Sequence, residues 1–260
     1  MTLLAWIVLF CLLGGVLSVL AAATFLIIPQ ELRARTMPHL VSFAIGALLG
    51  AAFLGLLPHA IEQAGSDNAD SITAAVLAGL ILFFALEKLV IWRHCHHEQH
   101  EGHIPDFRAA TKRSAGTLIL IGDGVHNFVD GVLIGAAFLT NVPLGVLTSL
   151  AVAAHEIPQE LGDFIILLES GYNRTQALLL NIASSLATVL GGALAWLSLS
   201  GSSAALPYLI AVAVASFVYI AVADLIPGLH ERTDFRAGVT QMLLITGGIG
   251  AIAATEALFR

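Results

Sequence analysis

The sequence predicts an all-α polytopic membrane protein with eight transmembrane helices, and three observations carry this prediction. Of the 260 residues, 58% are hydrophobic and 11% are charged, whereas a soluble domain has roughly 25% charged residues. The chain contains eight apolar stretches, each about as long as the 20-residue helix that crosses the hydrocarbon core. The period-two alternation of a membrane barrel is absent. Helices are therefore expected, because lipid offers the backbone no hydrogen-bond partners.

The stretches are justified in chain order by length, apolarity and the breaks between them. The first begins directly after Met1 without a basic segment, which favours a span over a cleaved signal peptide. The second and seventh carry a late proline, Pro58 and Pro227, which membrane helices tolerate. The fourth and fifth are joined by a short turn at 141–143 and should form an antiparallel hairpin. The predicted spans are 3–28, 38–61, 71–92, 115–139, 143–168, 175–198, 205–228 and 237–258.

The Lys and Arg residues predict the orientation of the spans. They cluster after spans 1, 3, 5 and 7, and none lies in the loops after spans 2, 4 and 6. Positive loops stay in the cytoplasm, so both termini are predicted to be extracytoplasmic. The residues on the predicted cytoplasmic side are Arg33, Arg35, Lys88, Arg93, Arg108, Lys112, Arg113, Arg174, Arg232 and Arg236.

Composition also limits the partners. The net charge of −7 and the lack of a basic cluster on a soluble face argue against nucleic-acid binding, and no nucleotide-binding motif is present. Cys11 and Cys95 are too few for a disulfide framework. We expect a single domain over residues 1–260 in the plasma membrane (the inner membrane of a bacterium). Its expected partners are the lipid bilayer and divalent metal ions, with a homodimer as the candidate assembly.

Spans 2 and 7 share a weak repeat. Pro58 is followed by His59 and Glu62, and Pro227 is followed by His230 and Glu231. Interrupted helices paired in inverted halves are typical of transporters, so an inverted repeat of spans 1–3 and 6–8 around the span 4/5 hairpin is predicted. The alternative is that proline is simply tolerated near helix ends. The candidate transport-path residues are His59, Glu62, Asp123, Asp163 and Asp224.

Acidic residues without cations mark spans 4 and 5. No Lys or Arg occurs between Arg113 and Arg174, and a charge at the bilayer centre costs several kcal/mol. A bound metal cation would supply the missing positive charge, and protonation is the alternative. The acids well inside these spans are Asp123, Asp130, Glu156, Glu160 and Asp163.

The spacing within these spans favours metal binding. His126 and Asp130 are four residues apart, as are His155 and Gln159, so each pair shares a helix face. Both pairs lie at a similar distance from the turn of the hairpin and are expected near the bilayer midplane. Imidazole nitrogen with carboxylate and amide oxygen suits zinc or another first-row divalent ion. Pro158 frees a backbone carbonyl in the same region.

These residues carry a resemblance to a known family. The sequences HNFVDG (126–131) and HEIPQELGDF (155–164) resemble the ZIP family (Zrt/Irt-like proteins) of divalent-metal transporters. The resemblance implies a binuclear site midway through the membrane. It also implies a role for each matching position. The primary site would comprise His126, Asp130, His155 and Gln159, and the second site would add Asn127 and Glu156. Glu160 matches the final acid of the family's HEIPHE pattern, and Asp123 and Asp163 match its flanking acids. Gln159 stands where many relatives have His or Glu.

The segment between spans 3 and 4 is rich in histidine and forms a predicted cytoplasmic loop over residues 94–114. Such tracts bind metals loosely, so metal capture is predicted, and a flexible linker is the alternative. The candidate ligands are His94, Cys95, His96, His97, His100 and His103.

The function expected from these features is import of a divalent metal ion into the cytoplasm by alternating access around the span 4/5 site. Zinc is the first candidate, and iron or manganese are others. No catalytic residue or cofactor is expected. Two alternatives stay open: an intramembrane zinc hydrolase, since HEIPQ resembles the HExxH protease signature, and a passive metal channel or sensor.

Overall fold

The computed structural model describes residues 2–25, 27–97, 107–201, 204–230 and 234–259. Within them the chain forms eight helical rods, three of which are composed of shorter segments joined end to end. The rods are α1 (Leu3–Gly14) with α2 (Val16–Phe25); α3 (Gln30–Gly50) with the π-helix η1 (Ala51–Leu56) and α4 (Leu57–Ala64); α5 (Ala69–His97), preceded by the 3-10 turn η2 (Ser66–Asn68); α6 (Phe107–Thr140); α7 (Val142–Glu169); α8 (Arg174–Leu199); α9 (Leu206–Tyr219) with the π-helix η3 (Ile220–Leu225) and α10 (Ile226–Leu229); and α11 (Phe235–Phe259).

The chain is an all-helical polytopic membrane protein. Seven of the rods are long and apolar enough to cross a membrane. The remaining rod, α7, has 28 residues and sufficient length, but His155, Glu156 and Gln159 lower its mean hydropathy. The helix that is not apolar enough is therefore one of the two in which the sequence places metal ligands.

The helices extend beyond the predicted apolar spans. α3 begins at Gln30 rather than near residue 38, so Arg33 and Arg35 lie in a helix and not in a loop. Likewise α5 continues to His97 and α6 begins at Phe107, so only the middle of the predicted 94–114 loop lacks a described helix. Hydropathy marks the membrane-crossing part of a helix, whereas backbone hydrogen bonding continues into the water layer. The first span ends at Phe25, earlier than predicted.

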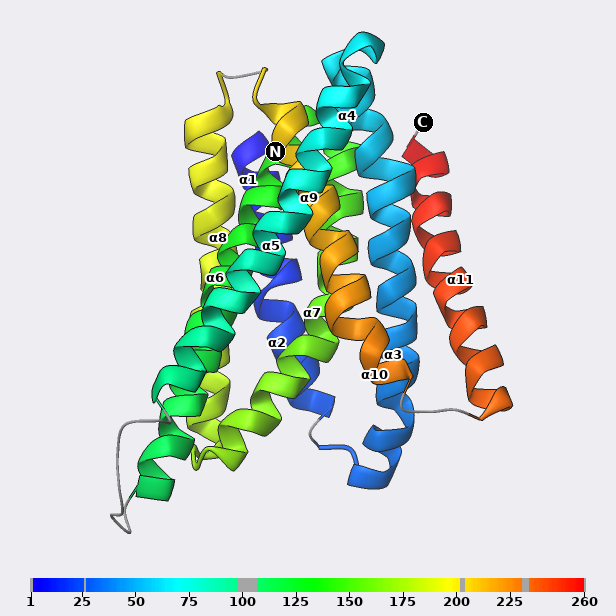
Figure 1. Ribbon diagram of the computed structural model, residues 1–260. Helices are drawn as coiled ribbons and strands as arrows, with labels where there is room; N and C mark the ends of the chain where they lie inside the picture. The colour runs from blue at the N-terminus through cyan, green and yellow to red at the C-terminus, as the bar shows by residue number, and fades with distance from the viewer. Residues whose placement is uncertain (1, 26, 98–106, 202–203, 231–233, 260) are drawn as a thin grey trace.

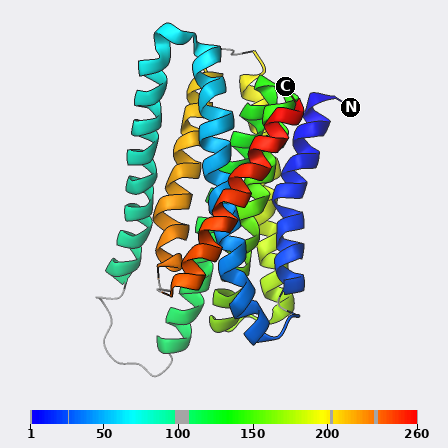
Figure 2. The ribbon, with the colours of Figure 1, turned by 90° about the vertical axis from the view of Figure 1, so that its right-hand side faces the viewer.

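Both termini lie at the same end of the bundle, which we call the upper end (Figure 1). The C-terminal end of α5 and the N-terminal end of α6 lie at the opposite, lower end. In the view of Figure 2, α5 forms one edge of the bundle and α11 crosses in front of α3. An even number of spans places both termini at the same end of the bundle, as observed here.

The helices pack in two groups. α6 packs along α8, and both contact α1, while α2 packs on α7 and α8. In the second group α3 packs along α11, and α5 packs along α9. Contacts of α7 with α3 and of α6 with α9 join the two groups. The hairpin that carries the predicted ligands therefore belongs to the first group and faces the second.

Glycines allow α6 and α8 to approach at backbone distance. A Cβ added at Gly131 would meet the carbonyl oxygen of Thr188, and one added at Gly191 would meet that of Phe128. Small residues at membrane helix interfaces permit such close packing. This contact sets the height of α8 relative to the ligands on α6.

Two π-helical segments, η1 and η3, interrupt spans 2 and 7 at matching places. η1 ends two residues before Pro58 and η3 ends two residues before Pro227. π-segments inside α-helices often occur at functional sites. The sequence repeat around Pro58 and Pro227 predicted interrupted helices in spans 2 and 7. It did not predict that the interruptions are π-helical.

Candidate metal centre

The hairpin of α6 and α7 forms as the sequence predicts. α6 ends at Thr140 and α7 begins at Val142. The side chain of Asn141 caps α7 by accepting a hydrogen bond from the backbone N–H of Leu144 at 2.7 Å. α7 then continues through Pro158 without a break in the helix. The tight turn holds the two ligand-bearing helices antiparallel and in a defined register.

Four side chains from the two helices converge at one point: His126, Asp130, His155 and Glu156. Their ligand atoms all lie within 4.8 Å of one another. The Nε2 atoms of His126 and His155 are 3.3 Å apart. His155 Nε2 lies 3.2 Å from Asp130 Oδ2, and His126 Nε2 lies 3.4 Å from Glu156 Oε1. The two longer separations are 3.8 Å for His126–Asp130 and 3.7 Å for His155–Glu156.

These separations match the edges of a zinc coordination tetrahedron. Zinc–nitrogen and zinc–oxygen bonds of about 2.0–2.2 Å place neighbouring tetrahedral ligands about 3.4 Å apart. Neither oxygen of Asp130 or Glu156 has a hydrogen-bond partner among the described residues. Two buried carboxylates facing two imidazoles without a counter-charge therefore form a group suited to a divalent cation.

The backbone orients His155 for coordination. Its Nδ1 lies 3.1 Å from the carbonyl oxygen of Ala151. A carbonyl only accepts, so Nδ1 carries the proton and the lone pair of Nε2 points into the four-ligand group. The ring of Phe217 on α9 packs edgewise on the imidazole, with ring centroids 6.2 Å apart. His155 is thus positioned from both sides, by its own helix and by the second helix group.

Asn127 is fully buried and lies in a polar chain that runs from α6 to α8. Its amide nitrogen donates to Asp123 Oδ1 at 2.9 Å, and its amide oxygen accepts from the hydroxyl of Thr188 at 2.8 Å. Thr188 was not among the site residues that the sequence predicted. The available signal was the series Asn181, Ser185 and Thr188, which places polar residues on one face of an otherwise apolar helix.

The other predicted ligands on α7 lie along the same helix. Glu160 is fully buried, and both of its carboxylate oxygens lack a hydrogen-bond partner among the described residues. It interacts electrostatically with Asp123, Glu156 and Asp163. Gln159 and Asp163 are half-buried. The acids therefore form a series that leads from the four-ligand group toward the lower end of α7.

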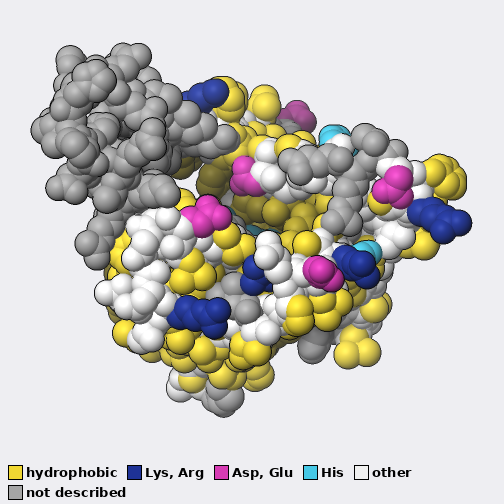
Figure 3. Space-filling view, turned by 90° about the horizontal axis from the view of Figure 1, so that it is seen from below, with side chains coloured by type: hydrophobic (Ala, Val, Ile, Leu, Met, Phe, Trp, Pro, Cys, Tyr) yellow, Lys and Arg dark blue, Asp and Glu magenta, His cyan; other side chains and the backbone are white. Residues whose placement is uncertain are grey.

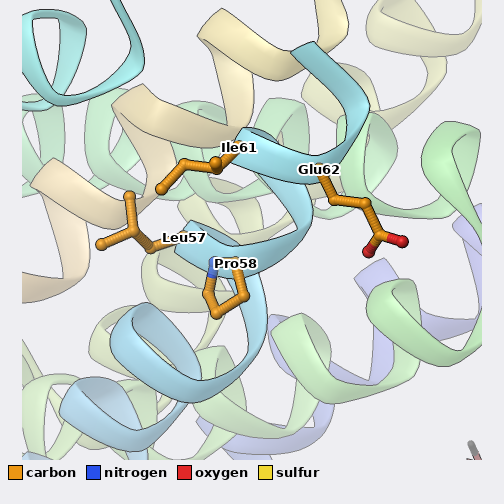
Figure 4. A pocket seen from close by; sticks show the side chains of 4 residues that line it. All are labelled: Leu57, Pro58, Ile61 and Glu62. Atoms are coloured by element: carbon orange, nitrogen blue, oxygen red, sulfur yellow. The ribbon is translucent and has the colours of Figure 1, made fainter. Parts of the chain in front are cut away.

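The candidate path residues on spans 2 and 7 lie outside the four-ligand group. His59 donates from Nδ1 to the carbonyl oxygen of Gly55 at 2.9 Å. Glu62 lies on the rim of a pocket in the upper half, which Leu57, Pro58 and Ile61 also line; its carboxylate points away from Leu57 and Ile61 (Figure 4). Asp224 is exposed within η3.

The predicted metal-capture residues cannot be placed against the site. His94, Cys95, His96 and His97 lie on the last turns of α5, where only the backbone is described, and His100 and His103 lie outside the described residues.

Comparison with known proteins identifies the family of the chain. The family described as ZIP Zinc transporter matches residues 2–114 and 91–256. The chain belongs to the ZIP zinc transporter family. It is 33% identical to the zinc transporter ZIP13 of Pongo abelii over 92% of this chain and 76% of that protein. It is 31% identical to ZIP13 of Mus musculus over 92% of this chain and 78% of that protein. The zinc transporter ZIP4 of Rattus norvegicus is 32% identical over 82% of this chain and 41% of its own length.

Membership in the ZIP family decides between the functional classes left open by the sequence. ZIP proteins are transporters and not enzymes, so the intramembrane hydrolase is the wrong alternative. The HEIPQ sequence shares His155 and Glu156 with the protease signature, but Gln159 stands where the second histidine would be. The chain is an integral membrane protein of a zinc-transporting family, with a buried His, Asp and Glu group suited to the transported ion.

Proposed function

We propose that this protein imports zinc into the cytoplasm by alternating access around His126, Asp130, His155 and Glu156. The observation that carries the proposal is the set of ligand separations, 3.2–3.8 Å in every measured nitrogen–nitrogen and nitrogen–oxygen pair. In this proposal zinc is the cargo. Asn127 and Gln159 contribute to a second ion position beside it.

The direction of transport rests on the distribution of charge. Arg33 lies early in α3, Lys88 late in α5, and Arg174 at the start of α8, and all three ends are at the lower end of the bundle (Figure 1). Positive segments are retained in the cytoplasm. The lower end is therefore the proposed cytoplasmic side.

The burial pattern supports a site open toward the lower end. Above the four ligands, Ile134 and Phe138 on α6 and Leu144 and Leu147 on α7 are buried. Below them, Asp123 and Glu160 are buried, but Gln159 and Asp163 are half-buried, and these polar residues form no apolar layer as continuous as the upper one. The lower face is hollowed near its centre, with Asp and Glu side chains at the rim (Figure 3). Movement of zinc from the upper side thus requires a second arrangement in which the apolar upper layer opens.

An inverted repeat supplies a route to such a second arrangement. One offset matches η1 to η3 and Pro58 to Pro227. The same offset matches two close helix contacts: Gly79 of α5 approaches Ala215 of α9, and their equivalents, Gly248 of α11 and Gly46 of α3, also approach each other. Inverted halves of this kind favour alternating access, with the first helix group sliding against the second. The proposal includes all eight rods as spans and both termini outside the cytoplasm.

The remaining parts of the proposal concern location and assembly. The plasma membrane (a bacterial inner membrane) is the proposed location, and a homodimer is the proposed assembly. His59, Glu62 and Asp224 serve as path residues at the two ends, and the His-rich segment captures metal on the cytoplasmic side.

Accessibility labelling tests the orientation. A cysteine at Asp67, an exposed residue between α4 and α5, should react with an impermeant thiol reagent added outside intact cells. A cysteine at Glu101 in protein carrying Cys95→Ser should react only after the cells are opened. The buried native Cys11 is the internal control and should stay unlabelled. The reverse labelling pattern would refute the import direction.

Replacing Gln159 by His tests the chemistry of the site. An imidazole suits zinc better than a neutral amide does, so Gln159→His should tighten zinc binding by about tenfold, or about 1.4 kcal/mol. Tighter binding should slow release and lower the maximal uptake rate into proteoliposomes. Gln159→Asn is the matched control, because it retains an amide. Unchanged affinity in Gln159→His would place residue 159 outside the ion site.

A further inference from the structure

Below the four-ligand group, three helices carry buried polar atoms that lack partners. Asp123 on α6 is 5% exposed, and Glu160 on α7 and Asn181 on α8 are both 0% exposed. Among the described residues, both side-chain polar atoms of Asn181 have no hydrogen-bond partner, and Asp123 Oδ2 and both oxygens of Glu160 have none of good geometry, with Ser184 beside Asp123 and Asn127 beside Glu160. Each such atom costs about 1–3 kcal/mol when it is buried unsatisfied. A fully buried amide with neither end satisfied is the least expected of the three.

The three residues lie at one height in the bundle. α6 and α8 rise in the same direction (Figure 1). The Cβ position of Gly124 lies 3.9 Å from Ser184 Cβ, which places Asp123 beside the 181–184 turn of α8. Asp123 also interacts electrostatically with Glu160 on α7.

The packing of α7 and α8 agrees with this height. Ala177 shares a buried cluster with Phe164 and Leu167. One turn above Ala177 is Asn181, and one turn above Phe164 is Glu160, because the two helices run in opposite directions. Asn181 lies on the buried stripe of α8 that also carries Thr188. The amide, the two carboxylates and the helices that hold them therefore meet in one region.

This region is separate from the four-ligand group. Asp123 precedes His126 by three residues and Asp130 by seven, and Glu160 follows Glu156 by four, which at 1.5 Å per residue gives about 4–10 Å along α6 and about 6 Å along α7. Its donors are all oxygens, with no imidazole. Oxygen ligands suit harder divalent ions and hold zinc less tightly than histidine does.

We propose that Asp123, Glu160 and Asn181 form a further, all-oxygen cation site, distinct from both ion positions of the proposed function, that receives the divalent ion as it leaves His126 and His155 toward the lower face. The proposal rests on the proposed function for the direction of release, but the site itself is defined by these three residues. A weaker site below a tighter one lets the ion leave in two short steps, since conduction requires binding that also permits exit.

Manganese binding to the purified full-length protein tests the site. In protein carrying both His126→Ala and His155→Ala, which removes both imidazoles of the four-ligand group, pulsed electron paramagnetic resonance should detect bound Mn²⁺ without the nitrogen coupling that a coordinated histidine produces. Adding Asn181→Leu should lower the Mn²⁺ affinity of this site by about tenfold or more. Loss of a residue that supports a metal ligand typically costs about 10–100-fold in affinity. Adding Asn181→Asp should strengthen Mn²⁺ binding, because a carboxylate then replaces the amide.

The matched control is Ser185→Ala, one turn above on the same stripe. Ser185 is fully buried, but its hydroxyl already donates to the carbonyl oxygen of Ile182 at 3.0 Å, so Mn²⁺ binding should not change. If Asn181→Leu and Asn181→Asp both bind Mn²⁺ like the parent that lacks His126 and His155, the proposed all-oxygen site is wrong, whatever the transport data show. If wild-type protein fails to take up zinc into proteoliposomes, the proposed function is wrong, and the release role falls with it.

Discussion

Replacing His155 or Asp130 with alanine should abolish zinc uptake while the protein still inserts and folds. Asp130 Oδ2 and His155 Nε2 are 3.2 Å apart and both are buried. Changes in residues that merely support a metal ligand cost about 10–100-fold in affinity, so loss of a ligand should cost at least that much. The remaining carboxylate, Glu156, would also stay buried without its compensating partner.

The measurement combines zinc binding to purified protein with zinc uptake into proteoliposomes. Matched controls are His39→Ala and Asp70→Ala, which change exposed residues outside the four-ligand group and should retain both activities. Zinc binding and uptake at the wild-type level in His155→Ala and Asp130→Ala would show that the ion takes another route.

The Gly131→Ala substitution should cause the largest loss of stability in α6. A Cβ at Gly131 would overlap the carbonyl oxygen of Thr188, which is backbone and cannot rotate away. Overpacking of a tight interface costs about 1–3 kcal/mol and occasionally more, and a backbone contact should lie at the upper end. Moving α8 would also separate Thr188 from Asn127, which are joined by a 2.8 Å hydrogen bond.

Thermal unfolding in lipid nanodiscs measures this loss, and uptake measures its effect on function. Gly122→Ala is the control on the same helix, because no atom lies within 4 Å of a Cβ at Gly122. Alanine there should be neutral or stabilise the helix by about 0.5–1 kcal/mol. Equal melting temperatures for Gly131→Ala and wild type would mean that α6 and α8 can separate without cost.

The membrane class, the α6–α7 hairpin and most of the candidate metal ligands could be predicted from the sequence alone. These features are local. Apolar length sets a span, a four-residue spacing places His126 and Asp130 on one face, and the short turn at Asn141 brings His155 to the same depth. Each follows from helix geometry within one span or between two adjacent ones, so no distant contact was needed to infer it.

How the other helices complete the region depends on packing between helices. Glu156 joins both histidines in one group, and α8 places the hydroxyl of Thr188 on the amide oxygen of Asn127. The relative height of α6 and α8 depends on the backbone contact at Gly131 and Gly191, a pairing of residues far apart in the chain. Single-sequence periodicity reports which face of a helix is buried, but the partner of that face and its height follow from packing between helices.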